Sequence, residues 1–183
     1  METITATTSK TKWVLDPTHS ELVFKVKHLM ITNVKGEFRK FKAEIDGDDF
    51  IKSKITATID ASSIFTNDDN RDAHLKSSDF FDVENHKEIT FEGTSFKKLD
   101  DENYQLRGIL TIKGISKEVI LNVEFGGTTK DPWGNEKSGF SISGKINRKD
   151  FGLNWNATLE TGGVLVSEEV KIQAEVQLVK TFL

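Results

Sequence analysis

The side chains that could do chemistry gather in the segment RDAH. Arg71, Asp72 and His74 fall within four consecutive positions. An arginine fork can bind a phosphate or a carbonyl group through several donors, so Arg71 is a candidate contact for a ligand headgroup. Asp72 is adjacent to Arg71, points in a different direction on a helix, and is expected to brace the segment.

The four histidines do not form one site. His28 lies on the apolar face of the strand ELVFKVKH, whereas His19 falls at the other end of that strand. A histidine on such a face is either an ordinary rim residue or a hydrogen-bonding group of a pocket. The chain has no cysteine, which excludes thiolate chemistry and sulfur-based zinc sites. We therefore expect no metal and no cofactor.

The sequence motifs of common enzyme classes do not occur in this chain. It contains no nucleophile elbow, no P-loop, no HExxH pair and no glycine-rich dinucleotide loop. The sequence thus favours a binding protein that is not an enzyme. A cavity enzyme that uses a rim histidine and aspartate for acid–base chemistry remains an alternative.

The composition restricts the classes of partner that the protein could bind. The chain has 183 residues, a net charge of -4 and a pI near 5.6, with lysines interleaved among glutamates, so no basic stripe indicates nucleic acid. No run of about 18 apolar residues predicts an integral membrane segment. The start METITATTSKTKW lacks the features of a secretory signal, from which we expect a cytoplasmic protein.

Alternating apolar and polar residues predict an antiparallel barrel. The pattern is clearest in EEVKIQAEVQLVK, where every second residue from Val170 to Leu178 is apolar. Eight such strands are predicted, and polar turns join them as antiparallel neighbours. Their ranges are 21–28, 34–46 with a bulge, 51–61, 88–96, 104–114, 118–127, 139–148 and the terminal strand from 169.

One helical insertion interrupts the strands. Thr66 and Asp69 have the spacing of a capping box, which predicts a short helix over 67–76, between the third and fourth strands. We expect residues 1–11 to be a flexible tail and residues 12–183 to be one barrel domain. The predicted fold class is all-β, with eight antiparallel strands.

The inner face of this barrel predicts a cavity for a long chain. Small residues such as Gly108 and Gly144 share the inward face with large apolar ones, which indicates open space. The barrel would be roughly 30 Å tall, matching a long hydrocarbon chain. Trp13 and Trp155 are interpreted as barrel plugs. The predicted ligand-binding residues are Phe24, Val26, His28, Phe38, Ile55, Ile59, Arg71, Phe91, Leu110, Ile112, Phe140, Ile142 and Trp155.

Five segments resemble a known family. WVLDPTHSELVFKVKHLMITNVKGEF, SSIFTNDDNRDAHLKSSDFFD, EITFEG, LRGILTIKGISKEV and INRKDFGL, in this order and spacing, are similar to the YceI-like family of lipid-binding proteins. The resemblance runs from Trp13 to Lys180. Relatives usually read YP before the ITF strand, where this chain has HK at 86 and 87, which predicts a changed surface there.

The resemblance implies an extended lipocalin-like barrel, frequently dimeric, whose apolar tunnel holds a polyisoprenoid or a similar fatty amphiphile. Many relatives carry a signal peptide and are periplasmic. On this basis the chain is expected to be a non-catalytic carrier of a long-chain isoprenoid, with a homodimer as a possible assembly. The alternatives are a protein-interaction module that uses the loops at the barrel end, and the cavity enzyme acting on a lipid.

Overall fold

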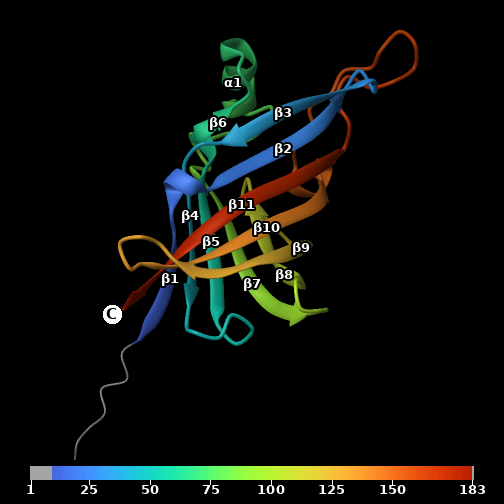
Figure 1. Cartoon of the computed structure of the whole chain (residues 1–183). Helices are drawn as coiled ribbons and strands as arrows, with labels where there is room; N and C mark the ends of the chain where they lie inside the picture. The colour runs from blue at the N-terminus through green and yellow to red at the C-terminus, as the bar shows by residue number, and fades with distance from the viewer. Residues whose placement is uncertain (1–9, 183) are drawn as a thin grey trace, which may run out of the picture.

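The computed structural model of the protein describes residues 10–182. These residues form strands, one α-helix and three short 3-10 turns (Figure 1). The strands are β1 (Thr11–Leu15), β2 (Glu21–His28), β3 (Thr32–Phe38), β4 (Phe41–Asp46), β5 (Lys54–Asp60), β6 (Ile64–Phe65), β7 (Glu88–Lys98), β8 (Asn103–Ile112), β9 (Ile115–Lys130), β10 (Glu136–Asn147) and β11 (Glu169–Phe182). The helix is α1 (Asp69–Lys76), and the 3-10 turns are η1 (Pro17–His19), η2 (Ala61–Ser63) and η3 (Arg148–Phe151).

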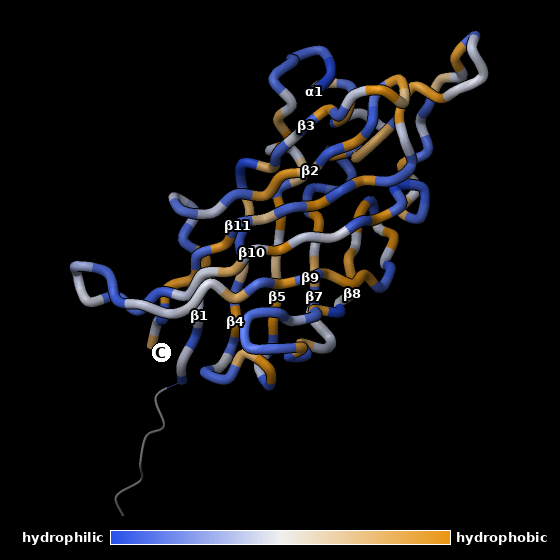
Figure 2. Tube along the Cα trace, turned by 45° about the vertical axis from the view of Figure 1, so that its right-hand side comes forward, coloured by the Kyte–Doolittle hydropathy of each residue, from blue (hydrophilic) through white to orange (hydrophobic). Residues whose placement is uncertain are grey.

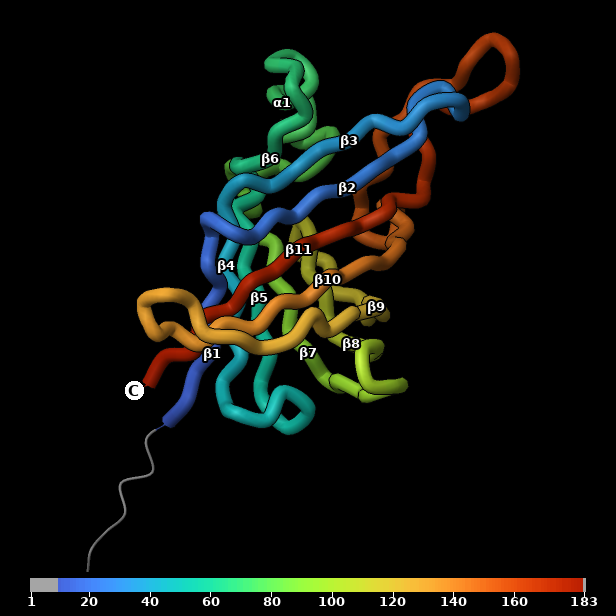
Figure 3. The backbone as a smooth tube through the Cα atoms, in the orientation of Figure 1, coloured from blue at the N-terminus to red at the C-terminus, as the bar shows by residue number. Residues whose placement is uncertain are grey.

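Eight of these strands close into an antiparallel ring. The order around the ring is β1, β4, β5, β7, β8, β9, β10 and β11, after which β11 pairs back to β1. Figure 3 follows the chain around this ring, and Figure 2 shows apolar and polar residues alternating along its strands. The predicted all-β, eight-stranded antiparallel barrel with one short helix is confirmed.

A three-stranded extension leaves the ring at the end that carries α1. The last part of β11 pairs with β1, but residues 171–175 of the same strand pair with β2. β2 pairs in turn with β3, and β3 pairs with the two-residue strand β6. The hairpin of β2 and β3 therefore projects beyond the ring (Figure 1).

The predicted place of the helix in the strand order is wrong. The pattern places it between the third and fourth strands, whereas α1 follows β6. The alternation pattern does not reveal β1, which has five residues, or β6, which has two. The predicted strand 34–46 is divided at residues 39–40 into β3 and β4. Thr11 already belongs to β1, and residues 1–9 of the predicted tail lie outside the described residues.

The helix also begins later than predicted, and Asp68 caps it. Asn67 has a φ of 62°, a left-handed conformation that cannot start a right-handed helix. The Asp68 side chain accepts a hydrogen bond from Arg71 N at 3.0 Å, as an N-cap residue does. Thr66 takes no part in the cap, because it donates to Asp72 instead.

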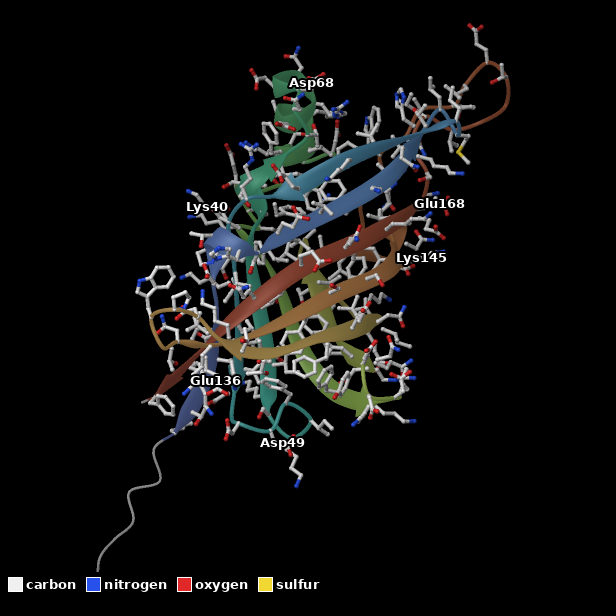
Figure 4. All side chains as sticks on the ribbon, in the orientation of Figure 1. Lys40, Asp49, Asp68, Glu136, Lys145 and Glu168 are labelled. Carbon is white, nitrogen blue, oxygen red and sulfur yellow. The ribbon has the colours of Figure 1, made fainter. Side chains whose placement is uncertain are left out.

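Aromatic side chains fill the base of the barrel, the end opposite α1. Phe50, from the β4–β5 loop, packs edge-on against Trp13 and Phe140, with ring centroids 5.4 Å apart in both pairs. Phe125 and Tyr104 continue this cluster, which we call the aromatic floor. Asp49, next to Phe50, marks this end in Figure 4, and Asp68 marks the other. Trp13 therefore plugs the base.

The inward glycines do not create open space, contrary to the sequence interpretation. A Cβ atom on Gly36 would lie 2.2 Å from the ring of Phe24, and one on Gly108 would lie 2.3 Å from the ring of Phe91. A Cβ atom on Gly144 would lie 2.6 Å from the Leu121 side chain. Each of these glycines is covered by a large neighbour, so open space in the barrel must come from its width.

A hydrogen-bonded aspartate stabilises the kink between β1 and β2. Asp16 Oδ1 accepts from Thr18 Oγ1 at 2.7 Å and from Thr18 N at 3.0 Å. Asp16 Oδ2 lies 2.9 Å from His19 Nδ1 and 3.0 Å from Lys137 Nζ on β10. The Thr18 hydroxyl, the His19 ring and the Lys137 ammonium hold the pKa of Asp16 well below its usual range.

We predict that Asp16→Asn destabilises the fold at pH 7 by about 1–2 kcal/mol, because it removes a charged acceptor from a largely buried site. A carboxylate with a lowered pKa stabilises the fold above its unfolded pKa, about 3.9, and less as the pH falls. The difference between variant and wild type should therefore shrink below about pH 4. Urea unfolding at pH 7 and pH 3 measures it. Asp101→Asn, at a fully exposed side chain, is the matched control and should change neither value.

Candidate ligand-binding cavity

The barrel contains a large apolar cavity between the aromatic floor and α1. Its volume is about 630 Å³, within the range of small-molecule and cofactor sites. Ring strands, β2, β3 and α1 contribute to its wall. Residues 153–168, which we call the strap, connect η3 to β11 and close one side of the cavity with Leu153, Trp155, Leu165 and Val166.

All predicted ligand-binding residues lie on the wall of this cavity. They are Phe24, Val26, His28, Phe38, Ile55, Ile59, Arg71, Phe91, Leu110, Ile112, Phe140, Ile142 and Trp155. Alternation accounts for those on strands, because every second residue of a strand faces the same side, whereas Arg71 lies on α1 and Trp155 in the strap. Their contact with a ligand stays a prediction.

The apolar wall is only partly buried. On β2, Leu22, Phe24 and Val26 face the cavity and are half-buried, as are Ile142 on β10 and Val176 on β11. By contrast, residues near the floor such as Leu178 are fully buried. Apolar surface that faces a void forgoes packing contacts and remains a favourable surface for an apolar occupant.

Polar residues gather at the end of the cavity next to α1, which we call the mouth. Arg71 Nε donates to Thr66 Oγ1 at 2.8 Å, and Arg71 Nη2 donates to Thr66 O at 2.6 Å. Thr66 N and Oγ1 donate to the buried carboxylate of Asp72 at 2.8 and 2.6 Å. Asp72 therefore braces the insertion, as predicted, and Arg71 is fixed at the cavity with its Nη1 donors left over from these bonds.

His74, which follows Arg71 by three residues on α1, meets Trp155 of the strap at the mouth. The two rings meet edge to face with centroids 4.7 Å apart, and both pack against Phe80. His74 Nε2 also lies 2.8 Å from Asp79 Oδ2. Trp155 is held at the rim by these neighbours, and its role as a plug stays a prediction.

A buried arginine fastens the strap to the barrel. The guanidinium of Arg148 donates to the carbonyl oxygens of Ser167 at 2.8 Å, Trp155 at 2.8 Å and Val166 at 3.3 Å, and also to that of Leu153. Burial lowers the pKa of Arg148, and nearby Glu168 acts in the opposite direction. Sequence reasoning missed this clamp, because a strap without periodicity gives no sign of which carbonyls meet the arginine.

The described residues hold no group of three or more histidine, cysteine or acidic side chains that could bind a metal ion. Within the same range no helix is long and apolar enough to span a membrane. The cavity wall also carries residues of the strap and of the α1 segment that the sequence did not predict, including Thr66, Leu75 and Leu165. They come from a helix and from irregular segments, where no period of two marks the inward side.

A closed antiparallel barrel with an apolar interior and a polar mouth belongs to the class of lipocalin-like binding barrels. The model of the YceI-like domain matches residues 13–178. The chain belongs to this family.

The chain is also similar to individual proteins. It is 45% identical over 170 residues to the UPF0312 protein SERP2314 of Staphylococcus epidermidis, covering 91% of this chain and 96% of the relative. The crystal structure of the YceI protein of Campylobacter jejuni has a TM-score of 0.72 and 37% identity, covering 84% of this chain and 88% of that one. A polyisoprenoid binding domain from Saccharophagus degradans has a TM-score of 0.66 and 16% identity, covering 92% and 98%, and shares the fold.

We predict that Arg148→Met destabilises the protein by more than about 2 kcal/mol, because it leaves buried carbonyl oxygens without donors. Amide exchange should rise in residues 153–167, where the strap loses its clamp, and much less in the ring strands. Lys149→Met is the matched control. Its ion pair with Glu168 is exposed, so it should cost about 0.5 kcal/mol or less. Unchanged strap exchange in folded Arg148→Met would contradict the clamp.

Proposed function

We propose that the protein is a non-catalytic carrier that sequesters a long-chain amphiphile, a polyisoprenoid or a similar lipid, in the barrel cavity. The observation that carries this proposal is the apolar cavity of about 630 Å³ with polar groups gathered at its mouth. The Saccharophagus domain that shares this fold is a polyisoprenoid binding domain, which supports the ligand class.

The proposed ligand lies with its chain toward the aromatic floor and its headgroup at the mouth. Apolar side chains of β2, β8 and β10 line the path of the chain, among them Phe24, Leu110 and Ile142. Arg71 offers the headgroup its free Nη1 donors, and His28 lies on the same wall. An arginine fixed by Thr66 suits a phosphate or carbonyl oxygen without the cost of ordering a free side chain.

The contacts of the ionisable residues support binding over catalysis. Asp72 accepts two hydrogen bonds from Thr66, and Arg148 is bound to backbone carbonyl groups, so both serve the structure. His74 is paired with Asp79 at the outer rim. A ligand held without chemical change is the function that these roles favour.

Native mass spectrometry of the purified protein, followed by organic extraction, tests the proposal. We expect the extract to contain, reproducibly, a long-chain isoprenoid or a similar lipid that is chemically unchanged. Protein that is consistently empty after gentle purification would count against a carrier. Release of a chemically changed product would favour the cavity enzyme instead.

We predict that Ile142→Glu abolishes ligand retention while the protein still folds. The substitution places a carboxylate in the apolar cavity, where leaving it ionised and unpaired costs several kcal/mol. Ser143→Glu is the matched control, since Ser143 is the next residue on β10 and faces outward. It adds the same charge and should retain the wild-type amount of lipid. Equal lipid in both folded variants would show that the ligand does not occupy this cavity.

A further inference from the structure

The β2–β3 turn and the neighbouring part of the strap present exposed apolar side chains beside the mouth. At the β2–β3 turn, Met30 is 49% exposed and Ile31 is 77% exposed, and Leu29 and Val164 are exposed next to them. We call these four residues the apolar tip. Leu29 N donates to Leu165 O of the strap at 2.9 Å, which holds the two loops together. Figures 1 and 3 show both loops projecting beyond the barrel.

The β2–β3 turn contains residue types that its backbone disfavours. Ile31 N donates to His28 O at 3.2 Å, and the two central residues, Leu29 and Met30, have φ values of 54° and 60°. Hairpin turns with two positive φ angles favour asparagine and glycine: glycine has no Cβ atom to clash, and the short polar side chain of asparagine tolerates this conformation, whereas most other side chains are strained there. The turn thus exposes two large apolar side chains in a conformation that favours other residues. Stability of the turn does not explain their presence.

Lysines from four neighbouring strands form a row on the outer wall. Lys25 on β2 lies opposite Lys35 on β3 and opposite Lys171 on β11, and Lys171 lies opposite Lys145 on β10. All four are exposed, and none lines the cavity. We call them the lysine row. The sequence shows no basic stripe because each lysine comes from a different strand.

The lysine row is a local concentration of positive charge on a protein of net charge -4. Like charges directly opposite each other in a sheet destabilise it. The ammonium group of Lys145, which is labelled in Figure 4, lies 3.9 Å from the carboxylate of Glu169, and both side chains are exposed. Among residues 10–182, the other three lysines have no carboxylate within 4.0 Å. Neighbouring strands lie about 4.8 Å apart, so the row is about 14 Å wide. It suits a surface of anionic groups.

We propose that the apolar tip inserts into a lipid bilayer and that the lysine row lies over its anionic headgroups. Apolar side chains gain by entering the acyl boundary, and each lysine gains near an anionic surface. A second copy of the chain suits this face less well, because a twofold contact would bring two lysine rows together. A bilayer accounts for both features at once.

Docking in this way brings the mouth of the cavity to the membrane. His28, Leu165 and Val166 adjoin the apolar tip in the chain and line the cavity, so the segments that carry the tip also form part of the cavity wall. This inference goes beyond the proposed carrier function. Membrane docking needs no cavity ligand and can be measured separately from ligand retention.

Vesicle flotation tests the docking. Protein is mixed with phosphatidylcholine vesicles that contain or lack phosphatidylglycerol. We expect wild-type protein to float with the anionic vesicles and to bind much less to the neutral ones. Wild-type protein that stays unbound to both would overturn the proposal. Ligand retention of the same preparation, measured by mass spectrometry, reports on the carrier function alone.

The decisive variant is Leu29→Asn combined with Met30→Gly. It suits the turn better than the wild-type residues, so the melting temperature should stay equal or rise. Binding to anionic vesicles should fall at least about tenfold, because two inserting side chains are lost. The matched control, Ile51→Ser with Leu99→Ser, removes exposed apolar residues from the β4–β5 and β7–β8 connections, at the end away from α1 (Figure 1), and should bind like the wild type.

The lysine row is tested in the same way. Lys25→Gln with Lys171→Gln should weaken binding about fivefold for each lysine at low salt, and the difference should vanish in high salt. Lys97→Gln with Lys130→Gln, exposed and outside the row, is the control. Equal losses in control and test pairs would overturn the assignment. So would a tip variant that dissociates a dimer of the chain while vesicle binding is unchanged, since the tip would then bind a second copy.

Discussion

The structure depends on how β11 is shared between β1 and β2. The strand is 14 residues long, and it pairs with β1 near its C-terminal end and with β2 near its N-terminal end. Asp16 stabilises a kink between β1 and β2. The edges of these two strands that face away from β11 therefore point in different directions. The other edge of β1 meets β4 and closes the ring, whereas the other edge of β2 meets β3 and leaves it. The break between β1 and β2 thus allows the continuous strand β11 to close the base of the barrel and to leave its other end open.

The cavity results from this arrangement of the strands and not from the glycines on the inner face of the barrel. At the base, the rings of Trp13 and Phe50 pack against each other and against the core of the ring. Toward the mouth, the wall is widened by β2 and β3, and the same kinds of apolar side chain no longer meet in the middle. The inward glycines serve packing within the wall, since the rings of Phe24 and Phe91 lie over them. An eight-stranded ring is just wide enough for such a division between a filled part and an open part.

Sequence alternation predicted the parts of the fold whose side chains repeat in a regular order. It identified most of the strands from Glu21 onward and the inward side of several of them, and for this reason the predicted wall residues on strands lie on the cavity. It missed β1 and β6, because five and two residues are too few to show a period of two. The break at residues 39–40 was read as a bulge, since local alternation cannot tell a bulge from a change of pairing partner. The Arg148 clamp was missed because backbone carbonyl groups leave no mark on sequence.

The hydrophobic effect that would retain a long chain in the cavity would also oppose its release. Each methylene group moved from an apolar site into water costs about 0.8 kcal/mol, and every 1.4 kcal/mol is a factor of ten in the equilibrium constant. A chain of many carbons would therefore leave through water far too rarely for a carrier to be useful. Exchange requires a second apolar phase that meets the mouth directly. The strap and the β2–β3 turn, which border the mouth and are joined by the hydrogen bond from Leu29 to Leu165, are the elements of this fold that would make such contact.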